Sequence, residues 1–190
     1  ITCGAVQSNH CRLTLSWAVK EGLDCHLVLE ERVPGSYKPE ASGNNFLYQL
    51  MGVKSITVVP GGSPMPVEME KLAAKLRAEG RKPYIVPGGA SNPVGALGYV
   101  QCAQELMQQM FERGLNFDHI IVPSGSAGTH AGFLLGLLGC HMNIPVTGIG
   151  VNRKKPAQEE AVYKLMQDTA AYMGVSMDIP RDAVMAYDDY

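Results

Sequence analysis

The sequence carries little net charge and no long hydrophobic run. Its 16 Lys and Arg side chains nearly balance 18 Asp and Glu side chains, so the formal net charge at pH 7 is −2. Binding to a nucleic-acid backbone needs a cluster of basic side chains, and we therefore expect no nucleic-acid partner. The longest apolar runs, such as 133–138 and 144–151, are far shorter than the ~20 residues that a membrane helix needs. We also expect no membrane span.

Closely spaced cysteines are lacking as well. Five cysteines are scattered along the chain without a CxxC pair. This arrangement suits neither a disulfide framework nor a zinc site, and free cysteines are usually buried. The pattern predicts reduced structural thiols in a cytoplasmic protein, and no metal centre.

The chain has no initiating methionine and no signal peptide. It begins at Ile1, inside a segment that reads as a strand, and stops at Tyr190 without a terminating element. With 190 residues and 46% hydrophobic side chains, it is long enough for one large domain or two small ones. We interpret it as an internal fragment of a longer protein.

Short apolar runs rich in β-branched residues alternate with segments of helical periodicity. Such alternation predicts an α/β fold in which parallel strands are joined and flanked by helices. Apolar stripes that end at Gly22, Gly80 and Gly114 indicate three helices. The predicted strands are 1–6, 26–30, 56–60, 84–87, 119–123 and 146–151. A boundary between two lobes is expected at 113–117, which gives a smaller lobe 1–113 and part of a larger lobe, 114–190.

Ligands of parallel α/β sheets bind near the carboxyl ends of the strands, so the loops after strands are the candidate sites. The segment 123–132, Pro-Ser-Gly-Ser-Ala-Gly-Thr-His-Ala-Gly, follows a strand and precedes an apolar segment. Its glycines let backbone N–H groups approach an anion, and Ser126 and Thr129 add hydroxyl donors. It matches neither a Walker loop nor a GxGxxG turn. We favour phosphate binding over the alternative, a tight turn that needs glycines only for steric reasons.

A second loop, 4–10, also follows a strand and opens a helix. Ser8 or Asn9 would serve there as a helix N-cap, whereas Ser8, Asn9 and His10 together offer a hydroxyl, an amide and an imidazole to a ligand. The residues alone leave both interpretations open. A third loop, 87–93, has the same character, but turn formation explains it as well. The connection 32–43 is interpreted as a surface loop rather than a mobile lid.

Together these loops resemble the motifs of a known enzyme family. The segments Gly4-Ala5-Val6-Gln7-Ser8-Asn9-His10, 88–99 and 124–132 are similar, in order and spacing, to those of the D-cysteine desulfhydrase and aminocyclopropane-carboxylate (ACC) deaminase family. The resemblance covers almost the whole chain. Within the family, the stretches 33–38 and 44–52 most resemble cysteate sulfo-lyases.

The resemblance implies a two-lobed, tryptophan-synthase-β-like fold (fold type II), incomplete at both ends, with pyridoxal 5'-phosphate in the cleft between the lobes. It implies that Asn9 bonds the hydroxyl on the cofactor ring, and that Ser8, Asn9 and His10 bind the substrate carboxylate. Ser8 and Tyr190 would take part in catalysis, Ser8 in proton transfer and Tyr190 near the ring. The cofactor phosphate would be held by Gly125, Ser126, Ala127, Gly128 and Thr129.

For activity, the resemblance implies elimination from a small sulfur-containing amino acid. Cysteate would give pyruvate, sulfite and ammonia, or D-cysteine would give pyruvate, sulfide and ammonia. The alternatives are cyclopropane ring opening by an ACC deaminase, and a non-catalytic module that binds an anion or phosphometabolite.

Two groups of the family's active site have no match in the sequence. The family's Schiff-base lysine precedes the Ser-Asn-His loop, and none of the nine lysines present matches that position. The partner of the pyridine nitrogen has no match either, and we expect both groups to lie outside this chain. The resemblance also implies a homodimer.

Overall fold

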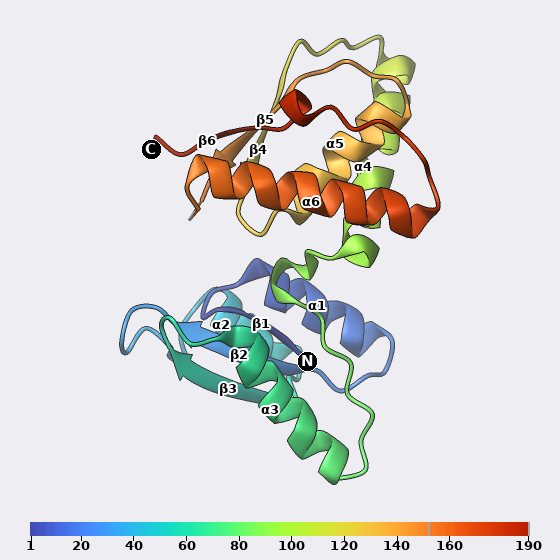
Figure 1. The fold of residues 1–190 in the computed structure, drawn as a ribbon. Coiled ribbons are helices and arrows are strands. Elements are labelled where there is room, and N and C mark those ends of the chain that lie inside the picture. Colours follow the sequence, from blue (N-terminus) through green and yellow to red (C-terminus); the bar gives the residue numbers. More distant parts are fainter. Residues whose placement is uncertain (152, 190) are drawn as a thin grey trace. The chain divides into compact units, whose positions relative to one another are not determined.

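The computed structural model describes residues 1–151 and 153–189. The chain divides into two compact units, Ile1–Gly89 and Ala90–Tyr190, and each is described by itself. Each unit contains a sheet of three parallel strands accompanied by helices (Figure 1). The expected α/β fold with parallel sheets is confirmed.

The first unit has three layers, in which a sheet of order β1-β2-β3 lies between helices on its two faces. Successive side chains of a strand point to opposite faces, so Leu27 and Leu29 of β2 join one buried cluster and Val28 joins another. Helices α1 and α2 cover the first of these faces, and α3 covers the second. The elements are β1 (Thr2–Ala5), α1 (Asn9–Lys20), β2 (His26–Glu31), α2 (Asn44–Leu50), β3 (Ser55–Pro60) and α3 (Met65–Ala78).

The second unit packs three helices with a sheet of order β4-β5-β6. Helix α5 is buried over most of its length, because it contacts both α4 and α6. Gly132 of α5 allows α4 to pack closely against α5, because a Cβ at this position would lie 2.3 Å from the Ala96 carbonyl oxygen of α4. The elements are α4 (Pro93–Arg113), β4 (Ile120–Ser124), α5 (Gly128–Gly139), β5 (Val146–Gly150), α6 (Lys155–Met173) and β6 (Met185–Tyr187).

The structure differs from the sequence expectation in several segments. The segment 84–87 forms no strand, and only Val86 pairs, in an isolated bridge to Thr2. Pro83 and Pro87 border it and have no N–H to donate to a ladder. Helices α2 and α6 and strand β6 lie where no element was expected.

Helix α4 belongs to the second compact unit, because it packs against α5 and α6. The compact units divide after Gly89, and the expected lobe boundary at 113–117 stays a prediction.

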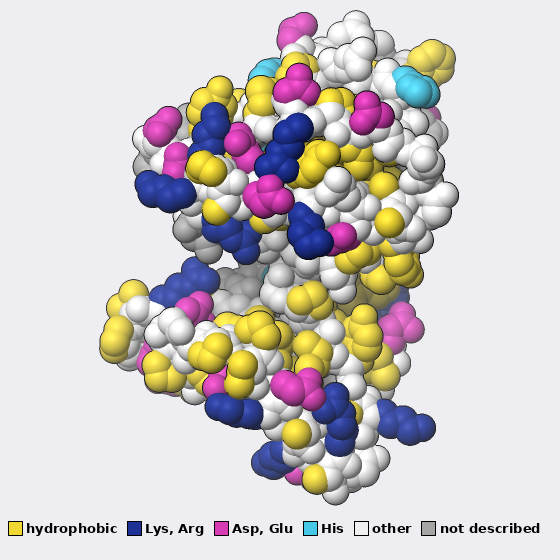
Figure 2. All heavy atoms as spheres, in the orientation of Figure 1, with side chains coloured by type: hydrophobic (Ala, Val, Ile, Leu, Met, Phe, Trp, Pro, Cys, Tyr) yellow, Lys and Arg dark blue, Asp and Glu magenta, His cyan; other side chains and the backbone are white. Residues whose placement is uncertain are grey.

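The surface shows no concentration of one charge on the face in Figure 2, where Lys and Arg are interspersed with Asp and Glu. Within residues 1–151 and 153–189, no helix is both long and apolar enough to cross a membrane.

Candidate functional site

The first group of candidate residues lies at the N-terminus of α1, directly after β1. Ser8 is the N-cap, and its Oγ accepts a hydrogen bond from the Cys11 N–H at 3.2 Å. Its carbonyl oxygen accepts a bond from the Tyr48 hydroxyl at 2.8 Å. A Cβ at position 4 would lie 2.4 Å from Ser8 Oγ, so Gly4 is needed for the close turn. The cap bond uses the Ser8 oxygen only as an acceptor, and while burial raises the pKa of the Cys11 thiol, a side-chain hydrogen bond of Ser8 lowers it.

The Asn9 side chain is exposed, and a second amide side chain holds it. Asn44, at the start of α2, donates from Nδ2 to Asn9 Oδ1 at 2.9 Å and to the Gln7 carbonyl oxygen at 2.8 Å. Because Ser8 caps the helix, Asn9 is not needed as a cap. The Asn9 Nδ2 group remains as a hydrogen-bond donor that Asn44 does not use.

The His10 ring is held by β1. Its Nε2 lies 2.7 Å from the Thr2 hydroxyl oxygen, and that hydroxyl donates to the Val86 carbonyl oxygen at 2.9 Å. A hydroxyl has one proton, so Thr2 accepts from His10, and the neutral ring carries its proton on Nε2. Burial lowers the pKa of His10 below its ordinary value, which favours the neutral ring at pH 7. The donor of His10 that remains for a carboxylate is its backbone N–H.

The second group of candidate residues is the loop between β4 and α5 in the second unit. Ala127 has a left-handed backbone at φ 80°, which turns the chain into the helix that begins at Gly128. A helix N-terminus has backbone N–H groups without acceptors and the positive end of the dipole. The first turn of α5 has no acidic residue. Ser91 Oγ accepts from the Gly128 N–H at 3.1 Å and borders this end of the helix.

Buried polar side chains fix both ends of this loop. Ser124 Oγ and His130 Nδ1, on either side of it, lie 3.2 Å apart. Gln158 of α6 donates to Ser124 Oγ at 2.8 Å and accepts a bond from Arg153, which also donates to the Gly125 carbonyl oxygen at 2.8 Å. Burial lowers the pKa of His130 to about 4, so its ring is neutral at pH 7.

The two groups fit the parts of pyridoxal 5'-phosphate that the resemblance assigns to them. A phosphate is bound by backbone N–H groups at a helix N-terminus and is disfavoured by a carboxylate, and the loop 125–129 leads into the N-terminus of α5, whose first turn has no acidic residue. A ring hydroxyl oxygen accepts hydrogen bonds, and Asn9 Nδ2 is a donor that the bond from Asn44 leaves unused. The expected catalytic residue Tyr190 lies outside the described residues. In the described part of the chain, no cluster of three His, Cys, Asp or Glu side chains could hold a metal ion.

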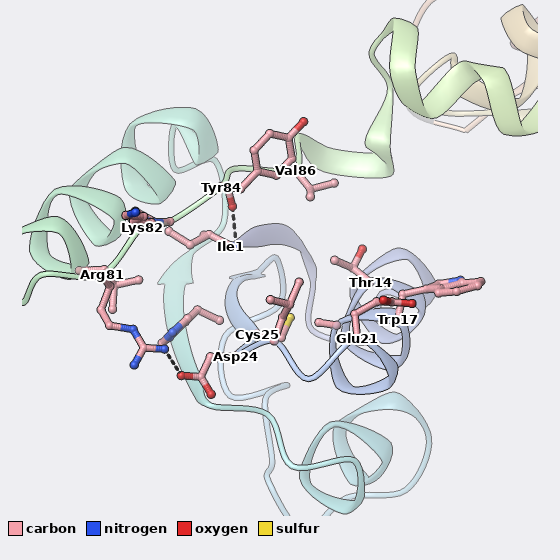
Figure 3. Close-up of a pocket in the computed structure, with 15 residues that line it drawn as sticks. Ile1, Thr14, Trp17, Glu21, Asp24, Cys25, Arg81, Lys82, Tyr84 and Val86 are labelled. Carbon is pink, nitrogen blue, oxygen red and sulfur yellow. Dashed lines mark hydrogen bonds and ion pairs between the residues drawn. The ribbon is translucent and has the colours of Figure 1, made fainter.

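A pocket of about 380 Å³ lies elsewhere in the first unit (Figure 3). Its lining includes Ile1, Trp17, His26 and Tyr84, and Asp24 there forms an ion pair with Arg81. Ile1 and His26 stand at the amino ends of β1 and β2, whereas ligands of such sheets bind at the carboxyl ends. This pocket contains none of the candidate residues, and we do not assign the site to it.

Sequence reasoning missed the residues that hold the candidate side chains in place. Asn44 is 35 residues from its partner Asn9, and Gln158 is 34 residues from Ser124. No local pattern connects residues so far apart. The one local signal is Gln158 itself, a polar residue on the apolar side of α6.

Comparison with known proteins finds a matching family and similar relatives for this chain. The family described as "Pyridoxal-phosphate dependent enzyme" matches residues 1–190. A D-cysteine desulfhydrase of Yersinia enterocolitica is 38% identical over the whole chain, and one of Serratia proteamaculans is 36% identical. The chain spans 57% of the length of each of these relatives.

Two solved structures are also similar to this chain. An ACC deaminase homologue superposes with a TM-score of 0.84 at 35% identity, over 98% of this chain and 54% of that one. The serine racemase of maize superposes with a TM-score of 0.56 at 17% identity, over 94% of this chain and 46% of that one, and is similar in fold alone.

Proposed function

The chain belongs to the family of pyridoxal-phosphate-dependent enzymes, and on that premise we propose that it forms part of a lyase that eliminates sulfide from D-cysteine or sulfite from cysteate. The observation that carries the proposal is the loop 125–129, which contains no carboxylate and leads into the buried helix α5. Ser124 before the loop and His130 after it contact each other and hold its two ends together. The D-cysteine desulfhydrase relatives support a sulfur-containing substrate.

Each candidate residue has a proposed role. The loop residues Gly125 to Thr129 hold the cofactor phosphate with backbone N–H groups and the hydroxyls of Ser126 and Thr129. Asn9 donates from Nδ2 to the ring hydroxyl oxygen. Ser8, Asn9 and His10 bind the substrate carboxylate, with His10 contributing its backbone N–H because its ring proton is committed to Thr2.

The cofactor supplies an electron sink for the carbanion that forms when the Cα proton leaves. The chain's own residues bind and orient the cofactor and the substrate, and they move protons. The Ser8 hydroxyl, whose oxygen accepts the cap bond from the Cys11 N–H, is proposed to pass a proton to or from the substrate. Tyr190 is proposed as a second group near the ring. The overall reaction of D-cysteine consumes one water and gives pyruvate, sulfide and ammonia.

The solved ACC deaminase homologue favours a second candidate, ring opening of the cyclopropane substrate to 2-oxobutyrate and ammonia. A third candidate is a module that binds a phosphate compound at the loop 125–129 without chemistry.

One set of assays separates these candidates. The intact protein, loaded with pyridoxal 5'-phosphate, is given D-cysteine, cysteate or the cyclopropane amino acid in separate reactions. We expect D-cysteine to give equimolar pyruvate and sulfide, or cysteate to give equimolar pyruvate and sulfite. Production of 2-oxobutyrate would assign the deaminase reaction instead, and cofactor binding without any product would leave the binding module.

Three further properties are proposed with this function. The substrate is a small amino acid, the assembly is a homodimer, and the location is the cytoplasm. The mass of the native protein in solution tests the homodimer. The five free cysteines, of which three are buried, suit the reducing conditions of the cytoplasm.

A further inference from the structure

We propose that Asn44 is a positioning residue that decides which end of the Asn9 amide is presented to the cofactor ring. This inference rests on the proposed function, because it concerns the donor that Asn9 offers. Asn44 belongs to α2, is 9% exposed, and has no place in the roles assigned above.

The orientation of the Asn44 amide follows from its backbone partner. The side-chain atom 2.8 Å from the Gln7 carbonyl oxygen has to be the nitrogen, since a carbonyl oxygen only accepts hydrogen bonds. The same nitrogen lies 2.9 Å from the Asn9 side chain. An amide nitrogen has two protons and no acceptor site, so both protons of Asn44 Nδ2 are donated.

The orientation of the Asn9 amide then follows in turn. The atom that receives the second proton has to be the oxygen, Oδ1. Rotating the amide by 180° would place two NH₂ groups against each other and lose this bond. Asn44 therefore leaves Asn9 with Nδ2 as the end available to a ligand, and Asn9 is exposed enough to use it.

This choice matters because the ring oxygen of the bound cofactor carries negative charge. A donor there makes a charge-assisted hydrogen bond, whereas an amide oxygen in the same place repels it. The polarity of one amide thus decides whether Asn9 helps or opposes binding.

The position of Asn44 is itself set by a further amide. Its backbone N–H donates to Gln7 Oε1 at 2.7 Å, and Gln7 Nε2 donates to the Ser42 carbonyl oxygen at 3.2 Å. Gly43, between these residues, has a φ of 74°, and a Cβ there would lie 2.8 Å from Gln7 Oε1. The start of α2 is thereby held against the loop that precedes α1.

The substitution Asn44→Asp tests the proposal, with Asn45→Asp as the matched control. A carboxylate at position 44 has no proton to donate, so it accepts from Asn9 Nδ2 and turns Oδ1 toward the ligand. Asn45 is 1% exposed and donates to the Lys38 carbonyl oxygen at 3.3 Å, whereas the Asn9 side chain bonds Asn44. The control thus makes the same chemical change at a neighbouring buried position.

The measurements are the affinity for pyridoxal 5'-phosphate and the pH titration of the bound cofactor's visible absorption, in the intact protein. We expect Asn44→Asp to weaken binding about 10- to 150-fold, equivalent to roughly 1.5 to 3 kcal/mol, and to move the titration toward higher pH. Asn45→Asp should leave the titration in place. In an Asn9→Ala background, Asn44→Asp should have no further effect, because it acts through Asn9.

Each other outcome has a definite meaning. If Asn44→Asp and Asn45→Asp titrate alike, or if the effect of Asn44→Asp persists without Asn9, the positioning role is wrong. If Asn44→Asp does not fold, Asn44→Ala replaces it, and an Asn44→Ala titration identical to wild type would also refute the role. A wild-type protein that binds no cofactor would instead refute the proposed function.

Discussion

At the scale of single residues, Asn9 separates a role in cofactor binding from a role in helix stability. In Asn9→Ala the ring oxygen loses a charge-assisted hydrogen bond, which contributes roughly 1.5 to 3 kcal/mol. We expect the affinity for pyridoxal 5'-phosphate, measured by fluorescence titration, to fall at least about tenfold. Because Ser8 and not Asn9 caps α1, the helix cap is kept, and any loss of thermal stability without cofactor should come only from the lost bond to Asn44.

Asn92→Ala is the control for loss of an asparagine at a helix start. Asn92 is the N-cap of α4 and accepts from the Gly95 N–H at 2.8 Å. Its loss should lower the free energy of unfolding by about 0.5 to 2 kcal/mol. A lowered melting temperature with unchanged cofactor affinity in Asn9→Ala would make Asn9 a structural residue like Asn92.

His130 makes stability depend on pH. Burial lowers its pKa to about 4, below the ordinary value of about 6.5, so the unfolded chain binds the proton at a higher pH than the native one. The free energy of unfolding should therefore fall as the pH drops from about 6.5 to 4, by roughly 2 to 4 kcal/mol from this group. Urea unfolding of His130→Gln across this range should show a shallower decline. Parallel curves for both proteins would mean that His130 contributes no such dependence.

The sequence predicts the residues that could touch a ligand better than those that hold them. Ser8, Asn9 and 125–129 stand out because they follow strands and carry glycines or polar groups. Their supports come from elsewhere in the chain: Asn44 reaches Asn9, and Arg153 reaches Gly125. Such contacts depend on the tertiary fold, which local spacing does not encode. The choice between cap and ligand residue in the loop 4–10 likewise needed the cap bond of Ser8.

At the scale of helices, the contact between α4 and α5 depends on the absence of side chains. A Cβ at Gly132 would lie 2.3 Å from the backbone oxygen of Ala96, and backbone cannot move aside cheaply. We expect Gly132→Ala to lower the free energy of unfolding by about 1 to 3 kcal/mol. Equilibrium denaturation measures this directly.

Gly98→Ala, on α4, is the matched substitution. Apart from its chain neighbours and the backbone of its own helix, no atom of residues 1–151 and 153–189 lies within 4 Å of a Cβ built there. Because alanine restricts the unfolded chain and favours helix, we expect Gly98→Ala to raise stability by about 0.5 to 1 kcal/mol. Equal effects of the two substitutions would show that helix propensity, rather than close packing, decides the cost.

The elements that the sequence predicts are those with a strong apolar period. Helices α1, α3 and α4 are predicted because their apolar stripes end at glycines 22, 80 and 114. Helix α6 is harder, because its buried face includes Gln158 and Thr169 among apolar residues. Helix α2 has seven residues and β6 three, too few to show a period. The segment 84–87 has strand composition, but Pro83 before it and Pro87 at its end leave it with a single bridge.

At the scale of the whole molecule, the chain carries two loops for one proposed ligand, and each belongs to a different compact unit. The loop 7–10 is in Ile1–Gly89, and the loop 125–129 is in Ala90–Tyr190. A ligand stabilises only the groups it contacts, by an amount that grows with its concentration over its dissociation constant. Inorganic phosphate and the complete cofactor should therefore differ in which loops they protect.

Hydrogen exchange followed by mass spectrometry of peptides from both loops tests this difference. At a phosphate concentration about 100 times its dissociation constant, amides of 125–132 that open locally should exchange up to about 100-fold more slowly. Peptides covering 7–13 should be unaffected by phosphate and protected by pyridoxal 5'-phosphate, because only the cofactor has a ring for Asn9 and its neighbours to bind. Protection of 7–13 by phosphate alone would place an anion site at the N-terminus of α1. Protection of neither loop by the cofactor would remove both from the proposed site.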